Sequence, residues 1–338
     1  MEKILTELCN SGTVSGNELV DLEIIKQLMP LVTIETDCNN NIIATMGNPD
    51  SKDVILLDAH NDRIGFVVSY IDDNGFIKVA NCGGIDRRVL LGSEVTVLGK
   101  KSLHGIVCCL PPHLSDGGED KAPSTDSIYI DTGLSKEEIT DVVSLGDNVI
   151  VNSRPKKLID SRFSAGSLDN KAGVATLIKV AHILAEKQLD CCVKFLFSSQ
   201  EETGFLGSRT ASFAISPSCA IVVDVSFAVQ PTVAPEKCGE LSKGSMIGIA
   251  PILDKEMFAE LKNISQQNNI PYQIEVMSGT TGTNADAITT SASGIRTALI
   301  SIPLRNMHTQ AEVVDMADIE KTADLIALYI VKRGAKNE

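Results

Sequence analysis

The feature that most constrains the fold is an alternation of strand-like and helix-like segments from about residue 156 to the end. The segment 171–187 repeats apolar residues at helical spacing, and Asp169 or Asn170 can cap its start. Further strands are predicted at 193–198, 220–225, 272–276 and 297–303, and further helices at 254–269 and 316–333. Alternation of this kind predicts a doubly wound α/β domain.

An earlier segment, 54–60 (VILLDAH), is an apolar run typical of a buried strand in a parallel sheet. Between the two α/β stretches, short β-rich runs are separated by turn residues, with no long helix. We therefore predict one α/β catalytic domain, 1–65 and 156–338, interrupted by a small all-β, barrel-like domain at 66–155. Within this insertion, the polar Gly/Pro-rich loop 111–125 is predicted to be mobile.

The composition of the chain limits which binding partners and which cellular compartment we expect. The chain has 338 residues and a formal charge of −14, which argues against nucleic acid and anionic membranes as partners. Its N-terminus has the pattern of a short amphipathic helix rather than a secretory signal, and no apolar run is long enough to span a membrane. The nine cysteines form no CxxC pair and indicate reduced thiols, so we expect a cytoplasmic protein.

Histidine and acidic residues gather where the predicted strands end. In open α/β sheets, ligands bind at the carboxyl ends of the strands. The residues found there are His60, Asp62, Asp169, Glu201, Glu202, Asp224 and His308. Each alone has an ordinary explanation, such as a helix cap or a turn residue, but their coincidence predicts a single site.

Ligand chemistry suggests a metal centre at this site. Residues i and i+2 of an extended segment point to the same side, so His60 can bind a metal while Asp62 holds its other ring nitrogen. The five candidate ligands are His60, Asp169, Glu202, Asp224 and His308. They exceed the three protein ligands of one catalytic ion and suit two ions about 3.5–4 Å apart. Imidazole and carboxylate donors favour Zn²⁺, Co²⁺ or Mn²⁺.

The adjacent residues Glu201 and Glu202 are predicted to have different roles. One binds a metal ion, and its neighbour acts as general base toward the metal-activated water. The remaining histidines are given other roles: His182 is expected to pack, and His104 and His113 to lie on the surface of the insertion. The chain has no GxSxG, P-loop or HExxH motif.

These residues resemble the tetrahedral, co-catalytic-metal aminopeptidases, metallopeptidase family 42, which include glutamyl and deblocking aminopeptidases and proteins once called endoglucanase M. The similarity extends over nearly the whole chain. The segments that carry it are 59–65 (AHNDRIG), 168–173 (LDNKAG), 200–204 (QEETG), 223–224 (VD) and 302–308 (IPLRNMH).

The resemblance implies a role for each site residue. His60 and Asp224 would hold one ion, Glu202 and His308 the other, and Asp169 would bridge them. Glu201 would be the general base and Asp62 would orient His60. It also implies a phosphorylase/hydrolase-like catalytic domain, with the β insertion used for dimer contacts and dimers assembling toward dodecamers.

The chain departs from the usual family pattern at Asn61, Arg63, Lys171, Asn284 and Asn306. The proposed ligands and the base are intact, so these changes bear on specificity. Arg63, which we place near the mouth of the site, is predicted to favour acidic side chains.

The predicted function is hydrolysis of N-terminal peptide bonds, in which a metal-bridging hydroxide attacks and Glu201 transfers the proton. A deacylase acting on N-acyl amino acids is the nearest alternative on the same fold. A glycoside hydrolase would need two carboxylates and no metal, so the two histidines argue against it. A catalytically inactive assembly protein would have lost a ligand, and none is lost.

Overall fold

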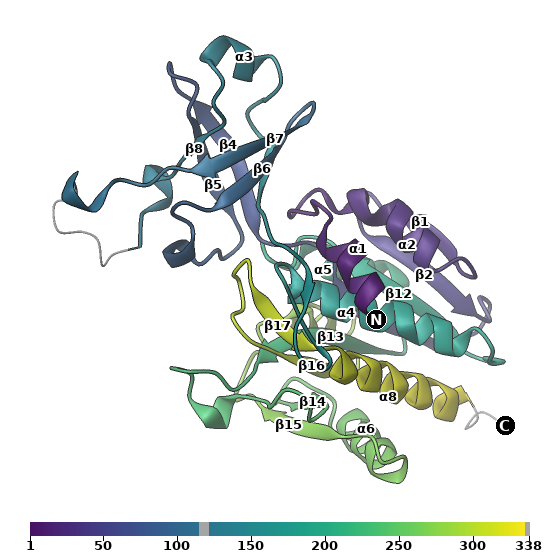
Figure 1. Cartoon of the computed structure of the whole chain (residues 1–338). Coiled ribbons are helices and arrows are strands. Elements are labelled where there is room, and N and C mark those ends of the chain that lie inside the picture. The colour runs from purple at the N-terminus through teal and green to yellow at the C-terminus, as the bar shows by residue number, and fades with distance from the viewer. Residues whose placement is uncertain (115–121, 335–338) are drawn as a thin grey trace.

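The computed structural model describes residues 1–114 and 122–334. Figure 1 shows an α/β body that carries both ends of the described chain, and a separate β barrel joined to one side of it. Part of the loop predicted to be mobile, 115–121, lies outside the described residues.

An eight-stranded sheet forms the centre of the α/β body. Its strands, in spatial order, are β1 (Thr33–Thr36), β2 (Ile42–Gly47), β12 (Cys192–Ser198), β3 (Val54–His60), β13 (Cys219–Phe227), β16 (Thr297–Leu304), β14 (Ser245–Ile249) and β15 (Tyr272–Val276). The four central strands, β12, β3, β13 and β16, are parallel. Their residues are almost completely buried, which explains the continuous apolar runs in the sequence.

Helices cover both faces of this sheet, which confirms the predicted α/β class. The larger core packs against α1 (Glu2–Cys9), α2 (Leu22–Leu28), α4 (Leu168–Leu184), α6 (Lys255–Gln267) and α8 (Met316–Gly334). The smaller core on the opposite face involves α5 (Leu206–Ile215) and α7 (Asn284–Thr289). None of the helices in the described chain is long and apolar enough to cross a membrane.

The barrel closes in the order β4-β5-β8-β7-β6-β9 around its own apolar core. Its strands are β4 (Gly65–Ile71), β5 (Ile77–Cys82), β6 (Glu94–Leu98), β7 (Ser102–Val107), β8 (Tyr129–Asp131) and β9 (Asn148–Val151). Closure leaves no long edge strand unpaired, which stabilises so small a sheet. A short helix, α3 (Lys136–Thr140), begins at a capping box formed by Ser135 and Glu138.

A small three-stranded sheet lies next to the main one, in the order β10 (Lys156–Lys157), β11 (Arg162–Ala165) and β17 (Glu312–Asp315). It links the residues that precede α4 to the segment between β16 and α8. The first of these segments leads into Asp169 and the second contains His308, so the small sheet brings distant parts of the chain to the same edge of the main sheet.

The backbone at the start of α4 departs from regular helical geometry. The helix ribbon begins at Leu168, but Asp169 and Asn170 do not have helical backbone angles, and the peptide between them is cis. The side chain of Asn170 accepts a hydrogen bond from the Gly173 amide at 2.9 Å, so Asn170 is the cap predicted from the sequence. Asp169, which precedes this cap, lies outside the regular part of the helix.

Candidate metal centre and active site

The structure brings all seven predicted site residues to the carboxyl ends of the central parallel strands. His60 ends β3, Asp224 lies on β13, and Glu201 and Glu202 follow β12. Asp169 precedes the regular part of α4, and His308 follows β16. All except Asp62 line one groove, whose volume is about 460 Å³. Asp62 is completely buried behind it.

Asp169 lies between the two histidines. One of its oxygens, Oδ1, is 3.1 Å from His60 Nε2, and the other, Oδ2, is 3.4 Å from His308 Nε2. A carboxylate with one oxygen toward each of two imidazoles has the arrangement of a ligand that bridges two ions.

The remaining carboxylates divide between the two histidines. Asp224 Oδ1 is 3.7 Å from His60 Nε2, and Glu202 Oε1 is 3.7 Å from His308 Nε2. Glu201 Oε2 is 4.0 Å from His60 Nε2. Two overlapping groups have potential ligand atoms within 4.8 Å of one another, His60 with Asp169 and Glu202, and His60 with Glu201 and Asp224.

Burial and crowding alter the acidity of these groups. Burial, together with neighbouring carboxylates, raises the pKa of Glu201 to about 9, of Glu202 to about 8 and of Asp224 to about 7. Burial opposes ionisation of Asp169 as well, but hydrogen bonds from His308 and His60 hold its pKa below the usual value. Four buried carboxylates with only two imidazoles make an excess of negative charge that divalent cations neutralise, so the residues present fit a metal centre.

Asp62 connects three parts of the site. Its Oδ1 is 3.3 Å from His60 Nδ1, and its backbone carbonyl oxygen is 3.1 Å from the same ring nitrogen. It also accepts hydrogen bonds from the backbone amides of Glu201, at 3.0 Å, and Glu202, at 3.2 Å. Ser15, from the loop after α1, donates to its other oxygen at 2.5 Å. Asp62 therefore also fixes the loop that carries Glu201 and Glu202.

Glu312 fixes the other side of the site and was missed in the sequence. Its two oxygens accept hydrogen bonds from the backbone amides of Asp169, at 3.1 Å, and His308, at 2.9 Å. Its side chain is buried, at 2 % exposure. Glu312 begins β17 rather than ending a strand, so a search at strand ends does not find it; its place four residues after His308 was the available signal.

Two of the departures from the family pattern bind one another. The Lys171 ammonium donates to the carbonyl oxygen of Asn61 at 2.6 Å and to its side-chain oxygen at 2.7 Å. It also pairs with Asp21 at 2.5 Å, and all three side chains are completely buried. Because Asn61 lies between His60 and Asp62, this contact holds the His60 loop against α4.

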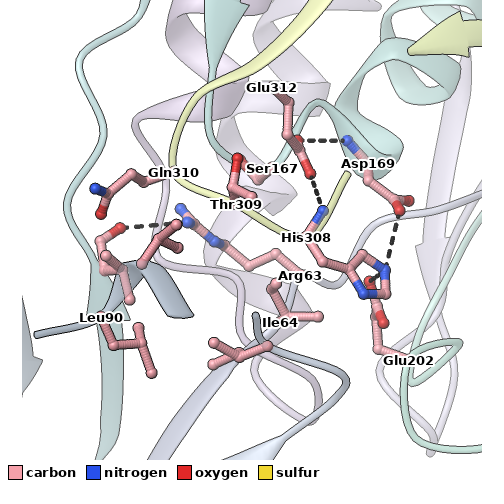
Figure 2. A pocket seen from close by; sticks show the side chains of 13 residues that line it. Arg63, Ile64, Leu90, Ser167, Asp169, Glu202, His308, Thr309, Gln310 and Glu312 are labelled. Atoms are coloured by element: carbon pink, nitrogen blue, oxygen red, sulfur yellow. Dashed lines mark hydrogen bonds and ion pairs between the residues drawn. The ribbon is translucent and has the colours of Figure 1, made fainter. Parts of the chain in front are cut away.

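Arg63 is not at the mouth of the site, contrary to the prediction. It is only 5 % exposed, and Figure 2 shows its guanidinium directed away from His308, toward the carbonyl oxygen of Val151 at 3.4 Å. The cavity beside it has a volume of about 20 Å³, which is room for about one water molecule. Asp169, Glu202 and His308 also line this cavity, so Arg63 lies behind the groove rather than at its mouth.

The structure also shows the surroundings of Asn284 and His182, which the sequence analysis singled out. Asn284 donates to Asp58 and Ser198, and accepts from Ser208, in a buried network beneath β3. His182 is exposed rather than packed, and its ring bonds to the carbonyl oxygen of Leu28.

Comparison with known proteins places this geometry in a family. The model of the M42 glutamyl aminopeptidase family matches residues 40–325. Lysyl aminopeptidase from Pyrococcus furiosus is 31 % identical over 333 residues, which cover 96 % of this chain and 94 % of the relative. Aminopeptidase APDkam598 from the archaeon Desulfurococcus kamchatkensis has a structure with TM-score 0.90 and 29 % identity, covering 97 % of this chain and 93 % of its own. The structure of the Pyrococcus horikoshii TET1 peptidase matches with a TM-score of 0.87 and 28 % sequence identity. This match covers 97 % of this chain and 98 % of the peptidase. The chain therefore belongs to the M42 aminopeptidase family and is a hydrolase of peptide bonds.

Proposed function

We propose that this protein uses two divalent metal ions to remove N-terminal residues from peptides, and that Glu201 is its general base. The observation that carries the proposal is the position of Asp169, with one oxygen toward each of two histidines. The paired carboxylates Asp224 and Glu202, one near each histidine, support it.

In this proposal His60 and Asp224 would hold one ion, Glu202 and His308 would hold the other, and Asp169 would contact both. Nitrogen and oxygen donors of this kind favour Zn²⁺, Co²⁺ or Mn²⁺. Bound ions lower the pKa of water and polarise a carbonyl group. Asp62 and Glu312 position the ligands through the hydrogen bonds described above.

Glu201 has the location of a proton carrier. Its side chain is 11 % exposed and lies in the groove where a scissile bond would sit. It accepts a proton from the attacking water as the water oxygen bonds to the carbonyl carbon. The carbon–nitrogen bond then breaks, and Glu201 transfers the proton to the leaving amine.

A deacylase acting on N-acyl amino acids would use the same groups and remains the second candidate. The matched relatives are named aminopeptidases. Because they include both a lysyl and a glutamyl aminopeptidase, the similarity does not identify the N-terminal side chain that this enzyme prefers. None of the residues supports a glycoside hydrolase over a metallopeptidase.

Assembly belongs to the proposal as well. The P. horikoshii TET1 peptidase is described as assembling into a tetrahedron or a large octahedral shell. By that likeness, we infer that residues 66–155 provide dimer contacts and that dimers build a larger homo-oligomer, up to a dodecamer. All nine cysteines are free thiols, which supports a reducing compartment such as the cytoplasm.

The test is hydrolysis of a panel of aminoacyl-p-nitroanilides and N-acetyl amino acids by chelated and metal-reconstituted protein. The proposal predicts cleavage of the anilides that is lost on chelation and restored by Zn²⁺, Co²⁺ or Mn²⁺. Cleavage of the N-acetyl compounds alone would identify a deacylase, and chelator-insensitive cleavage would refute the metal mechanism.

A further inference from the structure

A second cavity opens beside the metal groove. It has a volume of about 400 Å³ and shares Ser226, Phe227 and Thr281 with the groove. Ser226 follows Asp224 by two residues on β13, a distance of about 7 Å along a strand. The two spaces therefore adjoin, which places the second cavity within reach of a substrate side chain bound in the groove.

The carboxylate of Glu275 lies at this junction. One oxygen accepts a hydrogen bond from the Ser226 hydroxyl at 2.5 Å, and the other accepts from the Ser301 hydroxyl at 2.6 Å. Glu275 belongs to the edge strand β15 and pairs in register with Gly248 of β14. Since Gly248 has no side chain, the Glu275 side chain can extend across β14 to reach Ser301 on β16 and Ser226 on β13.

No cation within the described ranges neutralises Glu275. Its hydrogen-bond partners are two neutral hydroxyl groups, and no lysine, arginine or histidine there forms an ion pair with it. Glu236 and Lys237 also line the cavity, but both are exposed and their charges are opposite. Glu275 therefore determines the net charge of the cavity.

The other walls are mixed, with serine and threonine residues beside apolar side chains. Met246, Ile274 and Met277 line the cavity, and Phe227 stands 48 % exposed where the cavity joins the groove. Apolar surface beside an unpaired carboxylate suits a side chain that has a long aliphatic stem and a cationic tip.

We propose that Glu275 determines specificity by binding the side-chain cation of an N-terminal lysine or arginine, an inference that rests on the proposed aminopeptidase function. The stem of either residue spans the interval from the metal centre to the second cavity, and an arginine guanidinium can bind a carboxylate through two hydrogen bonds. An acidic N-terminal side chain is repelled by Glu275. This preference is opposite to the one predicted from Arg63, which is buried beside a cavity with room for about one water molecule.

The test compares lysyl- and norleucyl-p-nitroanilide, because norleucine has nearly the lysine stem without the ammonium group. We expect kcat/KM of the metal-loaded enzyme to favour the lysyl substrate by about 10-fold to 100-fold, the range for a hydrogen bond between charged groups. Glu275→Gln removes the charge at nearly constant shape and should abolish this preference while norleucyl turnover is kept. Glu236→Gln, in the same cavity but exposed, is the matched control and should keep the preference.

Equal kcat/KM for the two substrates in the wild-type enzyme would overturn the inference, as would a Glu275→Gln variant that slows both equally. Calorimetric binding of free L-lysine and L-norleucine to the metal-loaded protein tests the cavity without turnover. Weaker lysine binding in Glu275→Gln supports the inference, and equal binding of both amino acids contradicts it. A wild-type enzyme that cleaves neither anilide but binds lysine through Glu275 would refute the proposed function alone.

Discussion

Two buried carboxylates, Asp62 and Glu312, organise the site by accepting backbone hydrogen bonds rather than by facing the groove. Asp62 binds the amides of Glu201 and Glu202, and Glu312 binds those of Asp169 and His308. Main-chain contacts on both sides thus fix the positions of the residues that we propose as metal ligands.

At the residue scale, Glu201→Gln should retain its metal ions while kcat falls about 100-fold to 10,000-fold, the usual contribution of a general base. The amide keeps the shape of the side chain but cannot accept the proton. Metal content and kcat, measured on one preparation, check this outcome. Turnover within a few-fold of the wild-type enzyme would refute the role assigned to Glu201.

Glu312→Gln should weaken metal binding by about 10-fold to 100-fold, because an amide cannot accept hydrogen bonds from both the Asp169 and His308 backbones. Competition with a chromophoric chelator measures the affinity. Glu320→Gln, exposed on α8, is the control and should bind metal normally. An unchanged affinity in Glu312→Gln would show that Glu312 does not position the ligands.

The proposed ligands could be predicted from sequence because each of these side chains stands close to the end of an apolar strand or the start of a helix. Glu312, Ser15 and Glu275 could not, since their roles depend on which strands become neighbours. Arg63 was misplaced because the barrel packs over it: the carbonyl oxygen that it bonds belongs to Val151 of β9. A contact between an insertion and its host domain leaves no periodic signal in the sequence.

At the element scale, most long regular segments were predicted closely, but helix α5 and strand β14 were not, and the shortest strands were missed as well. The strand at 54–60 and the strand at 272–276 have the predicted bounds, because their apolar or β-branched runs are bounded by turn residues. The three-stranded sheet β10-β11-β17 was missed, since its strands are two to four residues long. Pairing across such short strands depends on the tertiary fold.

The junction of α4 with the His60 loop depends on the buried Lys171–Asp21 pair. Lys171→Met should lower the free energy of unfolding by about 3–5 kcal/mol, because it leaves Asp21 as a buried charge without its partner. Chemical denaturation measures the change. Adding Asp21→Asn should recover part of the loss.

The control is Lys26→Met, which removes a solvent-exposed pair with Glu23 and should cost at most about 1 kcal/mol. If Lys171→Met is no more destabilising than this control, the buried pair does not hold the two elements together.

At the scale of the whole molecule, the crowded carboxylates link stability to pH and metal. Glu201, Glu202 and Asp224 have folded-state pKa values of about 9, 8 and 7, above their ordinary values near 4, so the folded state retains protons that the unfolded state has released. His308, raised to about 9, acts in the same direction. This stabilisation is complete below about pH 4 and is lost as the pH rises toward 9.

We therefore expect the Tm of chelated protein to fall between about pH 6 and pH 9, and the increase in Tm on adding metal to be larger at pH 8 than at pH 6. Calorimetric scans with and without metal measure both trends. A Tm of the chelated protein that rises steadily over this interval would contradict the linkage.

The proposed metal centre is tested most directly by titrating chelated protein with Zn²⁺ or Co²⁺ while following bound metal and the cleavage of an aminoacyl-p-nitroanilide in the same samples. A site bridged by Asp169 predicts that two ions bind per subunit, that full activity requires both, and that Asp169→Asn lowers the affinity for the pair. Full activity with no metal, or saturation at one ion per subunit in both proteins, would contradict it.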